Sequence, residues 1–572
     1  MYLNNSIGKS ESVRKIYCHH EQGAAIAAEA YARIAEKPAL LNVTTGPGGI
    51  NALNGVFGAF TDSIPMIIVS GQVKRETLRS FNTNTGLRQL GDQEVDILSM
   101  ASGITKYSRL LKDANEIFSV LDDAMREATG GRPGPAWIDV PVDLQGVMLD
   151  VEDSFVSRPL DMSFEETVSD VLVAQADQLL DMIEDARRPV LFGGSGIRIG
   201  KAISEFIAFA EKRRLPLVTA WTHDLVPSDH ELFVGRPGTI GTRAGNFVVQ
   251  NADLVIILGS RLNVRQVSYN WGSFARNAKK VWVDIDPAEF RKPFVQADLE
   301  ILADAKVFLQ ILSDRLELRN KVRGFDGWLK WCQKIRGAYT PKTTDYPVSR
   351  DRINAYHFIS ELFHTLEEGD IVVCGNATAT IVPYQIGALK KGMRLISNSG
   401  SASMGYDIPA ALGAAVARSS ARVICLAGDG SAMMNIQELQ TISGLGLNVE
   451  VFILDNDGYL SIKQTQNNFF GREAGASSGS GLSFPDFTKL GAAFGLKSFR
   501  LNKRDWRNKL QKFVASNGPG LCCVELDLKQ EFEPRLKSKM QDGVITTPEL
   551  DDMYPFLPVE ELERVRAEAI EI

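Results

Sequence analysis

Short apolar runs alternate with longer stretches rich in Ala, Leu and Glu along most of the chain. Runs such as VICLA at 423–427 and VEVFIL at 449–454 have the length and composition of buried strands. Strands that alternate with helical stretches in this way are typical of parallel sheets covered by helices on both faces. The sequence therefore predicts an α/β fold made of doubly wound parallel sheets.

The chain has 572 residues, too many for one hydrophobic core, and it divides into three such blocks and a tail. We expect a first domain at 1–155, a second at 168–340 and a third at 350–530, followed by a polar, acidic tail at 531–572. A polar linker at 152–167 and a stretch rich in Lys, Tyr, Thr and Pro at 338–349 indicate the two boundaries.

The charge and the cysteines narrow the class of protein. The net charge is −7 and no Lys/Arg cluster dominates any segment, which argues against a nucleic-acid partner. No uninterrupted apolar stretch reaches the roughly 18 residues of a membrane-spanning helix, and we expect no membrane association or export. The six cysteines are scattered without CxxC spacing, which indicates reduced thiols in the core of a cytoplasmic protein. A small-molecule partner is therefore expected.

Two polar motifs follow two of the predicted strands. Asp429 stands between Gly428 and Gly430, and Asn456 comes 27 positions later (456 − 429), each just after an apolar run. Ligands gather beyond the carboxyl ends of strands in open α/β sheets. Carboxylate and amide oxygens suit Mg²⁺ or Ca²⁺, and the N–H groups of Gly430 and Ser431 can approach a diphosphate. GDG alone is typical of an ordinary turn, but the pair favours a metal-bridged diphosphate.

Six further motifs are spread over the three blocks: HHEQGAAIAAEAYAR, TTGPGGINALNG, DSIPMIIVSGQV, GRPGPAWIDVPVDLQ, SMGYDIPAALGAA and VDIDPAE. Together with the GDG and N-x-G pair, they make residues 1–528 resemble the acetolactate synthase branch of the thiamine diphosphate enzymes. The resemblance implies three doubly wound parallel-sheet domains: a pyrimidine-binding domain, a central FAD-binding-like domain, and a domain that binds thiamine diphosphate and Mg²⁺.

The resemblance also implies roles for individual residues. Glu21, which alone would be interpreted as an exposed acid favoured by the helix dipole, is similar to the glutamate that hydrogen-bonds the aminopyrimidine ring. Gln93 matches a glutamine near the substrate. Met404 matches the bulky residue that supports the bent cofactor, and the Ala402 carbonyl would receive its 4′-amino group. The implied Mg²⁺ ligands are Asp429, Asn456 and Gly458, and the implied diphosphate-binding residues are Asn376, Ala377, Gly428, Gly430 and Ser431.

The middle domain carries a second set of implied nucleotide-binding residues. In the resembling family this domain holds FAD, usually without a redox role in the main reaction, and Asp284 near a strand end is placed to accept ribose hydroxyls. The family's RFDDR segment is RLNVR here, with Asn263 and Val264 in place of two acids. We expect FAD, and a fold kept only for structure is the alternative. The other implied FAD-binding residues are Gly235, Gly238, Gly259, Ser260, Arg261, Arg265 and Asp304.

The implied reaction is a carboligation in which pyruvate loses CO₂ and its two-carbon unit passes to a carbonyl acceptor. The family's acetolactate synthases carry a tryptophan in a Q-W-Q context, where this chain has Thr465. The smaller side chain opens space, and pockets discriminate acceptors by such fit. A bulkier acceptor such as a nucleotide-linked keto sugar, a simple 2-keto acid decarboxylase, and a non-catalytic cofactor-binding paralogue are the alternatives.

The resemblance bears on assembly as well. In the superfamily the pyrimidine ring and the diphosphate are held by first and third domains of different subunits, which implies a homodimer or homotetramer with active sites at the subunit interface. Similar enzymes begin with an additional helix, strand and Gly-rich loop, whereas this chain opens at MYLNNSIG. We therefore expect that the natural reading frame starts earlier, or that the first sheet lacks one strand.

Overall fold

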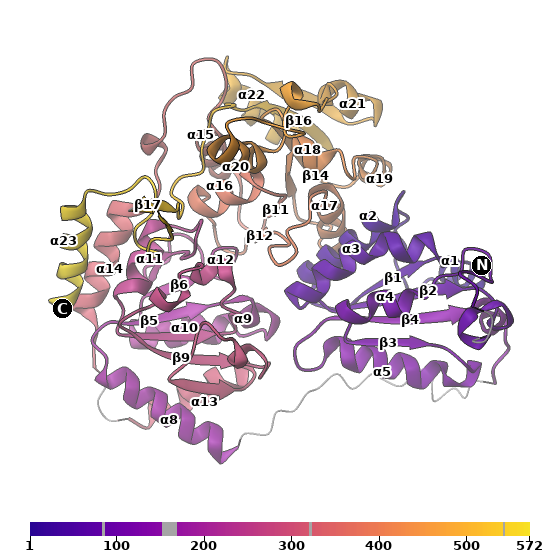
Figure 1. The fold of residues 1–572 in the computed structure, drawn as a ribbon, viewed down its shortest axis with the longest axis horizontal. Coiled ribbons are helices and arrows are strands. Elements are labelled where there is room, and N and C mark those ends of the chain that lie inside the picture. Colours follow the sequence, from indigo (N-terminus) through magenta and orange to yellow (C-terminus); the bar gives the residue numbers. More distant parts are fainter. Residues whose placement is uncertain (83–85, 151–168, 320–322, 542–543) are drawn as a thin grey trace.

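The computed structural model describes residues 1–82, 86–150, 169–319, 323–541 and 544–572. The expected polar linker at 152–167 lies outside the described residues. Within them, three parallel sheets covered by helices follow one another along the chain, and Figure 1 shows the third domain next to both the first and the middle domain. The predicted fold class is confirmed.

The first domain holds a four-stranded sheet in the order β1-β2-β4-β3. Strand β4 is buried along its whole length, since its sequence PAWIDVP is apolar except for one aspartate. Strand β1 lies at an edge, where Leu40 is exposed and Asn42 hydrogen-bonds Asn4. The elements are α1 (Tyr2–Lys9), α2 (Glu21–Ala35), β1 (Ala39–Val43), α3 (Pro47–Asp62), β2 (Met66–Gln72), α4 (Ile97–Ala101), β3 (Tyr107–Leu110), α5 (Ile117–Thr129), β4 (Pro135–Pro141) and α6 (Val142–Gln145).

The middle domain holds a six-stranded sheet in the order β10-β9-β8-β5-β6-β7, and its central strands β5 and β8 are fully buried. The apolar runs of this block form strands, among them β5, β6, β8 and β9. The elements are α8 (Asp170–Asp185), β5 (Pro189–Gly193), α9 (Ser195–Ile199), α10 (Ile203–Arg213), β6 (Leu217–Thr219), β7 (Phe233–Gly235), α11 (Arg243–Asn251), β8 (Leu254–Leu258), α12 (Val264–Val267), β9 (Lys279–Asp284), β10 (Leu299–Leu302), α13 (Ala305–Glu317) and α14 (Asp326–Tyr339).

The third domain holds a six-stranded sheet in the order β12-β11-β13-β14-β16-β15. Strands β13 and β14 lie at its centre and are buried on both faces, which explains their nearly continuous apolar sequences. The elements are α15 (Ala355–Thr365), β11 (Ile371–Cys374), α16 (Thr378–Ile386), β12 (Arg394–Ile396), α17 (Asp407–Ala417), β13 (Val423–Gly428), α18 (Asp429–Ala432), α19 (Glu438–Gly444), β14 (Val449–Asp455), α20 (Leu460–Phe470), α21 (Phe487–Ala493), β15 (Lys497–Leu501), α22 (Trp506–Val514) and β16 (Gly520–Glu525).

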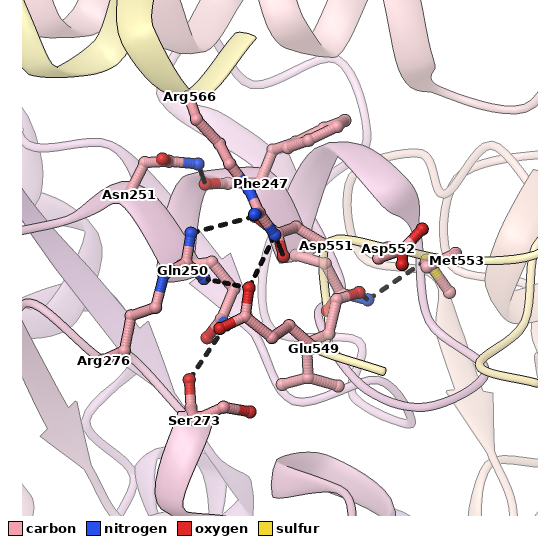
Figure 2. Close-up of polar contacts among 12 residues, drawn as sticks. Phe247, Gln250, Asn251, Ser273, Arg276, Glu549, Asp551, Asp552, Met553 and Arg566 are labelled. Carbon is pink, nitrogen blue, oxygen red and sulfur yellow. Dashed lines mark hydrogen bonds and ion pairs between the residues drawn. The ribbon is translucent and has the colours of Figure 1, made fainter. Parts of the chain in front are cut away.

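The C-terminal segment, expected to be a polar, acidic tail, returns to the middle domain. It contains the antiparallel pair β17 (Lys539–Gln541) and β18 (Val544–Thr546) and the helix α23 (Val559–Ile570), whose Val565 packs into the core of the middle domain. Figure 2 shows the ionic part of this contact. The fully buried Asp551 accepts two hydrogen bonds from Arg566, at 2.7 and 3.0 Å, and one from Arg276 at 3.3 Å.

The first domain packs against the third through α2 and α17. The helices approach closely because Gly413 has no side chain: a Cβ there would lie 2.0 Å from the carbonyl oxygen of Ala27. Glu29 is buried at this contact, where it accepts hydrogen bonds from Arg33 of its own helix, 3.0 Å from Nε, and from the Tyr406 hydroxyl of the third domain at 3.0 Å. A polar network therefore fixes how α2 lies along α17.

Glu450 in β14 predicts a pH dependence of stability. Its side chain is 1% exposed, and neither carboxylate oxygen has a hydrogen-bond partner. Burial raises its pKa from 4.5 to about 8, against the attraction of Arg422. Between these two pH values the unfolded chain loses this proton and the folded chain keeps it, so this group lowers the free energy of unfolding as pH rises.

We expect Glu450→Gln to melt like the wild type at pH 4.5 and at a higher temperature at pH 8, by roughly 2–4 °C for each kcal/mol regained. Differential scanning calorimetry across this range measures the effect. The exposed Glu368→Gln is the control and should leave the pH dependence unchanged. If the melting temperatures of the wild type and Glu450→Gln change with pH in parallel, the raised pKa of Glu450 is contradicted.

Candidate active site

A cavity of about 270 Å³ lies at the carboxyl edge of the third sheet, where the loops after β11, β13 and β14 converge. Its lining includes all the third-domain residues predicted from the sequence to bind cofactor or metal. The predicted residues in its lining are Asn376, Ala377, Ala402, Met404, Gly428, Asp429, Gly430, Ser431, Asn456 and Gly458. The two motifs that are 27 residues apart (456 − 429) therefore share one site.

Asp429 joins these two motifs directly. Its Oδ1 accepts the N–H of Gly430 at 2.7 Å, and its Oδ2 accepts the N–H groups of Asn456 at 3.2 Å and Gly458 at 2.8 Å. The side chain is 1% exposed, and burial raises its pKa to about 7. The carboxylate thus joins the two loops through backbone N–H groups, in a lining whose carboxylate, amide and carbonyl oxygens have the chemistry that suits Mg²⁺.

The loop after β14 has a strained backbone. Asp457 has φ 58° and Gly458 has φ 107°, and a Cβ on Gly458 would lie 2.2 Å from the carbonyl oxygen of Ala476. Lys463, which is 6% exposed, donates to the carbonyl oxygens of Asn456 at 2.7 Å and Asp457 at 3.0 Å. This lysine is not predicted from the sequence, because nothing in SIKQTQ indicates that its ammonium group points back at the preceding loop.

The loops after β11 and β12 face the same cavity. Ala377 and Ala402 both have φ 51°, which is uncommon for residues with a side chain. Asn376 Nδ2 donates to the Ala402 carbonyl at 2.8 Å, so this carbonyl, expected to receive the cofactor's amino group, already has one donor. Asn376 Oδ1 is buried without a hydrogen-bond partner, and Asn376 lines the cavity. This unpaired atom fits a site that completes its hydrogen bonds with a bound polar group.

Glu21 lies at the first position of α2, on the first-domain side of the interface with the third domain. Its Oε2 accepts from Asn51 of α3 at 3.1 Å, and one turn further along α3 the side chain of Asn54 accepts from Ser403. Ser403 precedes Met404, which lines the cavity. The structure therefore brings Glu21 to the domain interface beside the cavity, although Glu21 is not among the residues that line it.

Gln93 lies outside the cavity as well. Gln93 is exposed and has φ 60°. Its carbonyl oxygen lies against Gly46, because a Cβ on Gly46 would be 2.2 Å from that oxygen. Gly46 and Gly48 belong to the same GPGG segment. A Cβ on Gly48 would lie 3.3 Å from Glu21 Oε1, so Glu21 lies beside this segment as well. Glu21 and Gln93 therefore both lie next to this glycine-rich segment of the first domain, outside the cavity lining.

Comparison with known proteins agrees with this geometry. Residues 1–100, 176–312 and 374–524 match the N-terminal TPP binding domain, the central domain and the C-terminal TPP binding domain of the thiamine pyrophosphate enzymes. The chain is 31% identical over 535 residues to the acetolactate synthase isozyme 1 large subunit of Escherichia coli, covering 93% of this chain and 90% of that protein. The chain belongs to the acetolactate synthase family of thiamine pyrophosphate enzymes.

Relatives in other organisms give the same result. The probable acetolactate synthase large subunit of Methanocaldococcus jannaschii is 32% identical over 527 residues, covering 90% of this chain and 85% of that protein. The acetolactate synthase large subunit of Lactococcus lactis is 31% identical over 550 residues, covering 93% and 89%. The chain is therefore an acetolactate synthase-like carboligase that uses thiamine diphosphate, as the sequence motifs predicted.

In this member of the family, the middle domain contributes Arg265 to the cavity, together with Trp221 and Ile240. Arg265 is exposed and is the only basic side chain in the described lining. The structure thus places this predicted FAD-binding residue beside the residues that suit a diphosphate. It also contacts Gly238 through its backbone: a Cβ on Gly238 would lie 3.2 Å from the Arg265 carbonyl oxygen.

The other predicted FAD-binding residues surround the carboxyl edge of the middle sheet. Gly259 packs against the loop after β5 so closely that a Cβ on Gly196 would lie 2.6 Å from its Cα, and the next two residues are Ser260 and Arg261. Asp284 ends β9, and burial raises its pKa to about 6. Two residues have structural roles as well: Asp304 accepts the first N–H groups of α13, and Gly235 packs on Thr242.

Asp429 gives the sharpest test of the metal site. We expect Asp429→Asn to weaken Mg²⁺-dependent binding of thiamine diphosphate by more than about 100-fold, because loss of outer contacts around a metal alone typically costs 10–100-fold. Isothermal titration at fixed Mg²⁺ measures the dissociation constant. Glu368→Gln removes an exposed charge at the opposite edge of the same sheet, outside the cavity lining, and is the control. Equal affinities for Asp429→Asn and the wild type would refute the metal site.

Proposed function

We propose that this protein decarboxylates pyruvate and transfers the two-carbon unit to a carbonyl acceptor. The observation that carries the proposal is the Asp429 carboxylate, which accepts N–H groups from both halves of the paired motif inside one cavity. The names of its relatives support the reaction, since the proteins from Escherichia coli, Methanocaldococcus jannaschii and Lactococcus lactis are acetolactate synthase large subunits or probable ones.

The cavity residues fit thiamine diphosphate and Mg²⁺. Asp429, Asn456 and the Gly458 carbonyl would hold the metal, and the N–H groups of Gly430 and Ser431 would meet the diphosphate at the start of a helix. When bound, thiamine diphosphate supplies a carbon nucleophile and an electron sink for decarboxylation of a 2-keto acid. The chain itself has to bind, orient and exclude water.

Glu21 has the position of the acid that exchanges a proton with the aminopyrimidine ring. Its carboxylate is held by Asn51, and its helix is held by Glu438 of the third domain, which accepts the N–H groups of His19 at 3.0 Å and His20 at 3.2 Å. These bonds across the interface support a fixed distance between Glu21 and the Met404 loop. We propose that Gln93, on the neighbouring turn, contacts the substrate.

The identity of the acceptor depends on α20. Thr465 is exposed and donates to the Ser461 carbonyl at 2.9 Å, while Ser461 and Ile462 line the cavity. Thr465 stands where the family pattern has an indole, and its smaller side chain favours an acceptor larger than pyruvate as the second candidate function, such as a nucleotide-linked keto sugar. If pyruvate is the acceptor, the product is 2-acetolactate.

We propose further that the middle domain binds FAD. The support is the glycine packing at the switch between β5 and β8, where such sheets bind nucleotides, and the buried Arg236, whose Nη2 has no hydrogen-bond partner. An anionic group would satisfy this guanidinium. The substitution of two acids by Asn263 and Val264 argues for weaker binding than in the family pattern.

For assembly, we propose a homodimer or homotetramer in the cytoplasm. Helix α3, next to the active-site interface, exposes Ile50, Phe57 and Phe60, and a partner of the same chain would cover them. We also propose that in the assembly the contact between α2 and α17 forms between first and third domains of different copies. Five of the six cysteines are buried, which fits reduced core thiols. No helix among the described residues is long and apolar enough to cross a membrane.

Replacing Glu21 tests its proposed role in the proton transfer. We expect Glu21→Gln to lower both turnover and proton exchange at C2 of the cofactor by about 10²–10⁴-fold, the usual contribution of a general acid or base. Its affinity for thiamine diphosphate should change little, because Glu21 does not line the diphosphate cavity. Exchange is followed by proton NMR after acid quenching, with the exposed Glu11→Gln as control. Unchanged exchange in Glu21→Gln would refute the role.

A product assay tests the acceptor. Carbon-13 pyruvate is incubated with the protein, thiamine diphosphate and Mg²⁺, alone and with candidate keto sugars, and products are identified by mass spectrometry. We expect labelled 2-acetolactate with pyruvate alone, or a labelled branched sugar if the open rim of α20 selects a larger acceptor. Free acetaldehyde would indicate a decarboxylase. Absence of any product under all conditions would contradict the proposed carboligase.

A further inference from the structure

Asp407, at the first position of α17, is a fully buried carboxylate that the reaction described above does not use. Its Oδ2 accepts the Ser431 hydroxyl at 2.6 Å, and its Oδ1 accepts the N–H of Ile408 at 3.0 Å. Burial raises its pKa to about 6, so it is mostly ionised at pH 7.5. Keeping a charge in the core is costly unless it is hydrogen-bonded, and here both oxygens are.

The carboxylate lies where three loops of the cavity meet. Ser431 belongs to the GDG loop, and its hydroxyl oxygen also accepts the N–H of Gly405 at 2.8 Å, next to Met404. The loop after β11 packs on the same group: a Cβ on Gly375 would lie 2.6 Å from Asp407 Oδ2. Because the Ser431 hydroxyl is fully engaged in this way, Ser431 can offer a diphosphate only its backbone N–H.

We propose that Asp407 is a positioning residue for the cofactor site: through Ser431 and Gly405 it sets the distance between the metal loop at Asp429 and the loop that carries Met404. The proposal rests on the proposed binding of thiamine diphosphate in this cavity. Loss of the carboxylate leaves the Ser431 hydroxyl buried without an acceptor and frees both loops to move apart. Cofactor affinity then falls although no residue that touches the cofactor has changed.

If Asp407 had a purely structural role, the expected result would differ from that of a positioning residue. A buried acid that only stabilises the domain would lower the melting temperature without changing cofactor affinity in the folded protein. Asp370 provides this comparison in the same domain. It is buried at the opposite edge of the same sheet, before β11, and pairs with Arg422 far from the cavity loops.

The experiment compares Asp407→Ala, Ser431→Ala, the double variant and Asp370→Asn. Thiamine diphosphate is titrated calorimetrically at saturating Mg²⁺, and hydrogen exchange of the ligand-free proteins is measured for peptides covering 398–406 and 428–435. We expect dissociation constants about 10–100-fold higher for both single variants. The double variant should be no weaker than the worse single one, because both act through the same bond. Asp370→Asn should melt earlier yet bind normally.

Exchange in both peptides should be faster in Asp407→Ala and unchanged in Asp370→Asn. Wild-type affinity in Asp407→Ala, or losses that simply add in the double variant, would overturn the proposal. If Asp407→Ala does not fold, Ser431→Ala and the isosteric Asp407→Asn, which keeps one acceptor oxygen, replace it. If the wild type itself does not bind thiamine diphosphate, the proposed function fails, and the exchange data on the ligand-free proteins still decide whether Asp407 couples the loops.

Discussion

Parallel pairing of β13 with β14 brings the ends of two strands to one edge of the third sheet, with Gly428 opposite Leu454. Both of the loops that follow these strands carry acidic residues, whose like charges repel. A contact between the loops is therefore needed to hold them together. Asp429 provides the link by accepting N–H groups from both loops. Three donors aimed at one buried carboxylate shape the proposed metal site in advance, so less free energy is spent on ordering the loops when a ligand binds.

The sequence predicted this part of the molecule well for a physical reason. Buried parallel strands are nearly continuous apolar runs, so their carboxyl ends can be located from the sequence, and motifs at adjacent strand ends must meet. Asp407 and Lys463 could not be found in this way. Each is a single polar residue at a helix start or in a helix, and its partner is set by how loops fold over the sheet, which no local periodicity records.

The contacts of the C-terminal segment could not be predicted from its composition. The segment is polar and acidic, yet its Asp551 is fully buried between Arg276, at a separation of 275 residues, and Arg566. Composition alone does not distinguish an acid in water from one paired in the core. Arg276 lies in the middle domain, so its pairing with Asp551 depends on tertiary structure. Removing one member of such a buried set leaves an uncompensated charge, which makes the docking of α23 specific.

The active site also depends on an ion pair between the middle and third domains that lies outside the cavity. Asp224 of the middle domain accepts from Arg394 Nε at 2.7 Å and from the N–H of Leu395 at 3.0 Å, both in the third domain, and it pairs with Arg198. These two arginines hold the pKa of Asp224 well below its usual range. Asp224 follows closely after Trp221, a wall of the cavity. A shift of this ion pair would move Trp221 relative to Asp429, so the shape of the cavity depends on a buried ion pair between domains.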